Sequence, residues 1–228
     1  MIDLTKFKIP TEVMDILSGC PGYLVAGSVT ELVELSCRDA AVNGWHEVAY
    51  DVPGKGRVIE ANVCRVRNGV AANYTEPYMR RRDPDCMVIA DNLPTDKPRF
   101  NDRFGAPFVK LRQETFDWLK THELAIYFFI AGAPGKGINS MVVAPANAGF
   151  FAFGLALLQG ILNPEDMPEN FSPKAVIYIA PSFRHSHFDG KQMVVHNRTA
   201  NIYEMFSYNL YPGPSAKKGI YGMLIELG

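Results

Sequence analysis

The apolar residues of this chain follow helical spacing in some stretches and strand spacing in others. In residues 28–44 they recur every three or four positions, and Ser28 and Glu31 form a capping box at the start. Residues 148–161 are apolar on all sides, as in a buried helix. The spacing predicts helices over residues 11–19, 28–44, 112–123 and 148–161.

Two kinds of pattern indicate strands. Residues 46–52 and 57–69 alternate apolar and polar positions around the turn 53–56, whereas residues 124–133 are an unbroken apolar run that suits a strand covered on both faces. Further strands are predicted over 86–91, 140–146, 174–183, 191–197 and 201–209. Because helices alternate with both kinds of strand, the sequence predicts one α/β domain, residues 1–228, with a mixed β-sheet and flanking helices.

The composition is that of an ordinary globular chain. Its 228 residues are 47% apolar and carry a net charge of -1. Nucleic acid and anionic membranes select basic proteins, so neither is expected as a partner. The longest apolar run is too short to span a bilayer and the N-terminus lacks the pattern of a signal peptide, so we expect a cytoplasmic protein.

Three features of the sequence suggest a site at first sight but are better interpreted as parts of the fold: a sequon, a glycine-rich stretch and the cysteines. The sequon Asn197–Thr199 is expected to be silent in a chain without a secretory signal. The glycine-rich residues 132–137 have the wrong spacing for a phosphate loop and no hydroxyl after Lys136, so they predict a connection between two buried strands. Four cysteines are spaced too irregularly for a zinc site or a disulfide framework, and we interpret them as buried thiols: Cys20, Cys37, Cys64 and Cys86.

A pair of histidines allows two interpretations. His185 and His187 are two residues apart, so in a strand both imidazoles would face one side and could share a metal ion. Asp189 or His196 is then the available third ligand. The alternative is a loop, because Asp189 and the glycine after it are a turn signal.

Residues 80–82 are three consecutive arginines directly before a predicted strand. Adjacent guanidiniums repel one another, so at least one of them is expected to pair with an anion. Surface pairing with Asp83 and Asp85 is one outcome. The other is a bidentate clamp on a substrate carboxylate or phosphate.

A second basic cluster lies where a helix is expected to begin near the C-terminus. The breakers 212–214 precede Ser215, a good N-cap, and Lys217 and Lys218 then fall in the first turn. The macrodipole is positive there, so a cation costs about 0.3–1 kcal/mol. The turn is either simply solvated, or it binds a highly charged anion, or one lysine loses its proton and coordinates a divalent metal.

The order of these features resembles the N-terminal domain of phosphoenolpyruvate carboxykinases, and most of all the ATP-using branch. That domain has an arginine turn leading into a strand, similar to "RRRDPDCMVIADN", then a helix similar to "VKLRQETFDWLK" and a strand similar to "LAIYFFIAGA". It closes on a strand running into "APSF" and a Lys-Lys-Gly helix start, similar to "YPGPSAKKGIYGML". The similarity covers residues 57–228 and rests on collinear order and spacing.

The resemblance implies roles for four residues. Lys218 would bind the catalytic manganese as a neutral amine, and Lys217 would hold the transferring phosphoryl group. Arg82 would clamp the carboxylate of oxaloacetate or phosphoenolpyruvate. Tyr211 would lie beside the substrate, but its spacing from the lysines departs from the family pattern by one residue and the family's glutamate is missing.

The resemblance also implies an activity. The family decarboxylates oxaloacetate to an enolate, which takes the γ-phosphoryl group of ATP or GTP with Mn²⁺ or Mg²⁺. Its phosphate loop lies in a C-terminal nucleotide-binding domain, so residues 1–228 are expected to be the substrate-binding half of a protein from a divergent bacterial branch, inactive alone and without a tightly bound cofactor. The alternatives are a kinase-like enzyme of the same architecture acting on another small acid, and a non-catalytic assembly domain that kept the fold.

Overall fold

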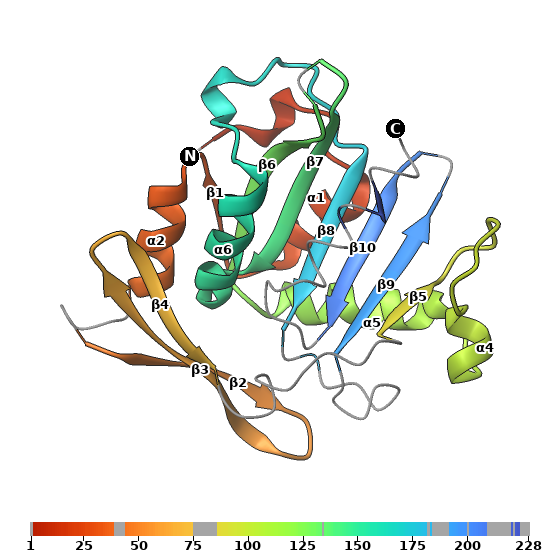
Figure 1. Ribbon diagram of the computed structural model, residues 1–228, viewed down its shortest axis with the longest axis horizontal. Helices are drawn as coiled ribbons and strands as arrows, with labels where there is room; N and C mark the ends of the chain where they lie inside the picture. The colour runs from red at the N-terminus through yellow and green to blue at the C-terminus, as the bar shows by residue number, and fades with distance from the viewer. Residues whose placement is uncertain are drawn as a thin grey trace.

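The computed structural model describes residues 2–38, 44–74, 86–133, 135–181, 183, 192–199, 201–208, 220 and 222–223. A seven-stranded mixed sheet with helices on both faces forms the body of these residues (Figure 1), which confirms the predicted mixed α/β architecture. In spatial order its strands are β1 (Tyr23–Ala26), β6 (Leu124–Ala131), β7 (Ile138–Pro145), β8 (Ala175–Ala180), β10 (Tyr203–Tyr208), β9 (Met193–Arg198) and β5 (Met87–Ile89).

The pairing of the strands sets which segments meet at each end of the sheet. Strands β7, β8 and β10 run in one direction, because both contacts among them are parallel. Strands β6 and β9 pair antiparallel with β7 and β10, and their outer neighbours β1 and β5 run parallel to them. We call the end where β10 finishes the Tyr208 end and the other the Arg198 end.

Within the described residues, helices cover both faces of this sheet. Helices α1 (Thr11–Gly19) and α5 (Phe108–Lys120) cover what we call the α5 face, where Ile16, Leu111 and Phe116 share one core with residues such as Phe128 and Phe206. Helices α2 (Val29–Cys37) and α6 (Gly149–Gln159) cover the α6 face. The unbroken apolar strands are therefore buried on both sides, as their patterns predict.

The start of α2 confirms the predicted capping box. The Ser28 hydroxyl accepts a hydrogen bond from the Glu31 amide at 3.2 Å, and the Glu31 carboxylate accepts one from the Gly27 amide at 2.6 Å. The helix packs closely on α6, because a Cβ on Gly149 would lie only 3.0 Å from the Ser36 hydroxyl. Glycine at this position lets the two helices approach each other.

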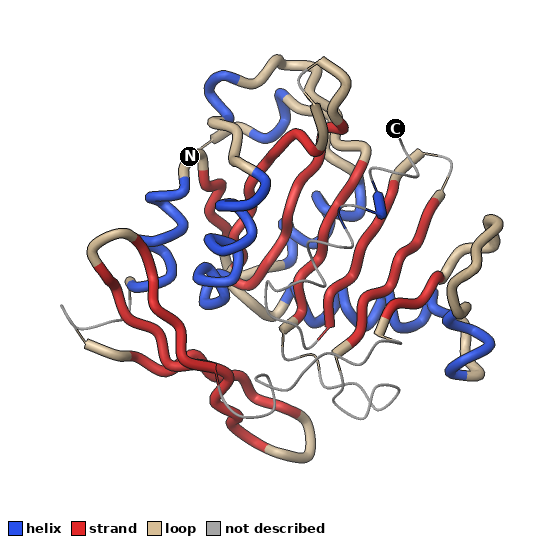
Figure 2. The backbone as a smooth tube through the Cα atoms, viewed as in Figure 1, coloured by secondary structure: helices blue, strands red, loops and turns tan. Residues whose placement is uncertain are grey.

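A second sheet is antiparallel and has three strands, β2 (His46–Val52), β3 (Gly56–Val66) and β4 (Gly69–Tyr74). Figure 2 shows it as a twisted ribbon beside α2. Val48, Ala61 and Val63 bury their side chains in the core of the α6 face, and Arg65 forms an exposed ion pair with Glu34 of α2. The small sheet is therefore attached to the body through the α2 layer.

Three elements were not predicted from the sequence. Strand β1 has only four residues between two glycines, helix α4 (Phe100–Phe104) has five, and β4 begins at Gly69, where the strand predicted over 57–69 ends. Helix α5 also begins at Phe108, before its predicted start. Strands β1 and β4 and helix α4 are too short for their apolar residues to form a clear repeat, and α5 starts directly after a polar connector. The remaining helical turns are η1 (Leu4–Lys6), η2 (Ala146–Ala148) and η3 (Pro164–Asp166).

The cysteines agree only in part with their interpretation as buried thiols. All four are free, and Cys37 and Cys86 are buried. Cys20 and Cys64 are only partly buried, which corrects the interpretation for these two. Burial raises the pKa of the Cys20 and Cys37 thiols, so both favour the protonated form.

Replacing Phe206 by Ala should destabilise the domain by about 3–5 kcal/mol, because it removes a fully buried ring. That ring stacks on Tyr178 at 4.8 Å and meets Phe108 edge-on at 5.1 Å. Urea unfolding would measure the loss. The control is Val109→Ala, which truncates a side chain that is 69% exposed and should change stability by about 0.5 kcal/mol or less. Equal effects of the two would contradict the assigned core.

Candidate functional site

The residues singled out as a site by the sequence lie outside the described part of the chain. They are Arg82, Tyr211, Lys217 and Lys218, together with His185, His187 and Asp189. Their roles therefore stay predictions. The described residues do show which strands flank the segments that contain these candidate residues.

Those segments join neighbouring strands at the same end of the sheet. Arg82 precedes the start of β5, the histidine pair lies between β8 and β9, and Tyr211 and the two lysines follow β10. At the Tyr208 end, Tyr208 pairs with Ala180 of β8 on one side and with Met193 of β9 on the other. Strand β5 begins beside them, with Met87 opposite Val194 (Figure 1). Four consecutive strands thus bring together the attachment points of all the predicted residues.

The Tyr208 end is held by α5. The Tyr208 hydroxyl lies 2.7 Å from the Thr115 hydroxyl, which itself donates to the Leu111 carbonyl at 2.7 Å. The Phe183 ring, just after β8, lies 5.5 Å from the Tyr208 ring and 5.9 Å from the Trp118 ring. Burial raises the pKa of Tyr208, so its hydroxyl stays protonated. The end of β10 therefore has a fixed position relative to the α5 face.

The glycine-rich connection lies at the opposite, Arg198 end. It joins the antiparallel strands β6 and β7, and Gly132 and Gly135 take positive φ values of 105° and 76°. A phosphate loop joins a strand to a helix, so that helix amides face the phosphates. This connection joins a strand to a strand, which confirms the predicted connection between two buried strands.

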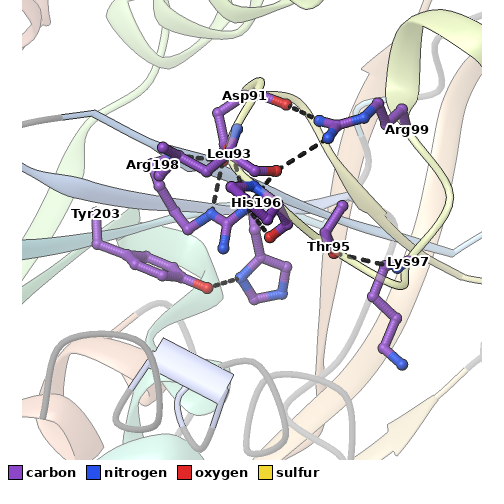
Figure 3. A network of polar contacts seen from close by, with 9 residues as sticks. Asp91, Leu93, Thr95, Lys97, Arg99, His196, Arg198 and Tyr203 are labelled. Atoms are coloured by element: carbon purple, nitrogen blue, oxygen red, sulfur yellow. Dashed lines mark hydrogen bonds and ion pairs between the residues drawn. The ribbon is translucent and has the colours of Figure 1, made fainter.

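A buried ion pair closes the Arg198 end of β9 and β5 (Figure 3). The Arg198 guanidinium donates to both Asp91 carboxylate oxygens, at 2.9 and 2.8 Å, and the two side chains are 7% and 6% exposed. Burial would raise the pKa of Asp91, but the hydrogen bonds from the Arg198 side chain and amide hold it below its usual value. Asp91 is therefore ionised and paired.

The same pair fixes the polar connector after β5. Arg99 donates to the carbonyls of Asp91 at 2.5 Å and Leu93 at 3.0 Å, and Arg198 also donates to the Leu93 carbonyl at 3.3 Å. Figure 3 shows the two guanidiniums on either side of this loop. Because these bonds are made to the protein's own backbone, we interpret the cluster as a structural clamp.

A second ion pair lies on the α5 face. Arg112 of α5 donates to both oxygens of Glu204 at 2.8 and 2.6 Å, and its guanidinium lies 4.6 Å from the centre of the Phe116 ring. The Asn197 amide donates to the same carboxylate at 2.7 Å. Asn197 is the sequon residue, so its nitrogen is engaged inside the fold.

His196 is a buried histidine on the α6 face. Its Nδ1 lies 2.5 Å from the Tyr203 hydroxyl, and its Nε2 has no hydrogen-bond partner among the described residues. Burial, with the nearby Arg198 charge, lowers the pKa of His196 to about 4, so the ring is neutral at pH 7. No group of three possible metal ligands occurs within the described ranges, so a site shared with His185 and His187 remains a prediction.

Sequence reasoning missed the ion-paired residues, although one signal was present. Glu204 is a lone charge in an otherwise apolar strand, and a charge in a strand covered on both faces requires a partner. Arg112 and Asp91 could not be assigned as partners, because they lie 92 and 107 residues from Glu204 and Arg198 in the chain.

The family model of a domain of unknown function, DUF4914, matches residues 9–228. The chain belongs to the DUF4914 family. No curated protein matches it. None of the helices in the described ranges of this DUF4914 domain has the length and apolar character needed to cross a membrane.

Replacing Asp91 by Asn should destabilise the domain by about 3–5 kcal/mol, because the buried Arg198 charge loses its anion. Urea unfolding at pH 7 gives the loss. The matched control is Glu47→Gln, which breaks the exposed Glu47–Arg57 pair and should cost about 1 kcal/mol or less. A cost for Asp91→Asn as small as that of the control would show that the clamp is dispensable.

Acid should destabilise the domain through His196. Its folded pKa of about 4 lies below the ordinary 6.5, so its contribution is fully present above pH 6.5 and is lost as the pH falls toward 4. The loss from this group amounts to about 3 kcal/mol. Unfolding curves between pH 7.5 and 4.5 would show it as a falling midpoint, with a shallower fall in His196→Gln. The same pH dependence in both proteins would rule His196 out as the cause.

Proposed function

We propose that this DUF4914 domain is the substrate-binding half of a phosphoenolpyruvate carboxykinase-like enzyme, which couples decarboxylation of oxaloacetate to phosphoryl transfer from ATP or GTP. The observation that supports the proposal is the meeting of strand ends at the Tyr208 end. Segments that are far apart in the sequence, and that carry the residues to which the family resemblance gives roles, are attached to adjacent strands there.

Chain geometry supports the same placement. Ile220 is buried in the core of the α6 face, and Lys218 is two residues before it, so their Cα atoms are within about 7 Å of each other. Cys86 is also buried, and Arg82 precedes it by four residues, a reach of about 14 Å at most.

The proposed roles follow from the chemistry of the groups. Arg82 would clamp a carboxylate of the small acid with two parallel hydrogen bonds, which lysine cannot reproduce. Lys217 would hold the phosphoryl group, Lys218 would hold Mn²⁺ or Mg²⁺ as a neutral amine, and Tyr211 would lie beside the acid. The metal, when bound, supplies charge stabilisation for phosphoryl transfer.

The test is Lys218→Arg in the protein expressed from the complete gene, assayed for oxaloacetate- and nucleotide-dependent turnover with Mn²⁺. A metal-ligating amine predicts loss of turnover by about a hundredfold or more, because arginine stays protonated and cannot coordinate a metal. Lys55→Arg is the control, since Lys55 is exposed in the β2–β3 turn.

Each other outcome has a defined meaning. Full turnover by Lys218→Arg would refute the metal-binding role. Absence of oxaloacetate turnover in the unmodified protein, with nucleotide-dependent phosphorylation of another small acid, would favour the kinase-like alternative. Absence of any turnover, with an oligomeric state that Lys218→Arg leaves unchanged, would favour an assembly domain.

A further inference from the structure

Several buried polar side-chain atoms lack partners among the described residues, and two of them lie on the α6 face of the neighbouring strands β9 and β10. They are Nε2 of His196 and the hydroxyl of Ser207, whose residues are 2% and 0% exposed. A buried donor left unpaired loses the hydrogen bond that it made to water in the unfolded chain, which destabilises the fold. Two such groups side by side therefore call for an occupant that completes their hydrogen bonds.

The register of β9 and β10 places the two groups together. His196 is opposite Met205, and Ser207 is opposite Val194, so His196 and Ser207 lie diagonally on the same face of neighbouring strands. Tyr203 is the diagonal neighbour of His196 on the other side and already contacts Nδ1, so Ser207 lies on the opposite side of His196. The Nε2 and Ser207 hydroxyl groups do not bond each other, because neither has a partner, which leaves them to one small bridging group. Ser207 is also the residue before Tyr208, so the pair extends from the Tyr208 end onto the α6 face.

The hydrogen bonding around His196 indicates what the bridging group must offer. Figure 3 shows the Tyr203 hydroxyl against one nitrogen of the His196 ring, with the other nitrogen directed away from it. The phenol is the stronger acid and the imidazole nitrogen the stronger base, so Tyr203 donates to Nδ1 and the ring proton is on Nε2. His196 and Ser207 then present two donors, which match the two oxygens of a carboxylate.

The charge of such a ligand is not balanced by Arg198, which is already paired with Asp91. The proposed lysine pair and Arg82 would balance it, so the inference rests on the proposed function. We propose that His196 and Ser207 form a carboxylate subsite for the small acid, with Tyr203 as the positioning residue that sets the tautomer of His196. The pair would orient the acid from the sheet side of the site.

Two measurements with oxalate, a small stable dicarboxylate, test this subsite. Calorimetric titration with Mn²⁺ present should show binding to the unmodified chain and a loss of affinity of about tenfold or more in Ser207→Ala. The matched control is Ser140→Ala. Ser140 is likewise fully buried in the large sheet, but its hydroxyl already donates to the Ile138 carbonyl at 2.9 Å, so oxalate affinity should not change.

The second measurement is made on the unmodified chain. The Nε2 proton of His196, assigned by its absence from His196→Gln, should shift in the NMR spectrum of the unmodified chain when oxalate is added. Oxalate binding that leaves both this proton and the Ser207→Ala affinity unchanged would overturn the subsite while leaving the proposed function intact. Absence of oxalate binding to the unmodified chain would overturn the subsite and count against the small-acid function as well.

Discussion

Burial of the central strands on both faces is the constraint on which the rest of this structure depends. Strands β7, β8 and β10 carry apolar side chains in both directions, so each face of the sheet needs its own helical layer. The polar groups that remain inside must then pair with each other. Asp91 with Arg198 and Arg112 with Glu204 do so through two hydrogen bonds each, which offsets part of their desolvation cost.

Strands β9 and β5 run opposite to β10, and this direction decides which strand ends meet. Had β9 run parallel to β10, its start would lie at the Arg198 end, far from the end of β10. Because the pair is antiparallel, the ends of β8 and β10 meet the starts of β9 and β5 at one place. The proposed phosphoenolpyruvate carboxykinase-like site depends on this arrangement, as does the extension of that site through Ser207 and His196.

The buried polar clusters of the domain differ in how many of their donors and acceptors have hydrogen-bond partners. The clamp around Asp91 has carboxylate, guanidinium and backbone carbonyls matched to one another, which is typical of groups that stabilise a fold. The Nε2 atom of His196 and the Ser207 hydroxyl are buried as deeply but lack partners within the described residues. A buried polar group without a hydrogen-bond partner in the chain destabilises the fold, and a ligand can supply the missing hydrogen bond.

The sequence by itself determined the fold class, the extents of α1 and β2, and the capping box of α2, because these depend on local period and local hydrogen bonds. It also predicted, correctly, that the glycine-rich residues 132–137 connect two buried strands. The tertiary structure alone decided the antiparallel placement of β9, the partners of Glu204 and Arg198, and the diagonal placement of His196 and Ser207 on one face. These depend on strand order and on contacts between residues far apart in the chain, for which a single sequence has no periodic signal.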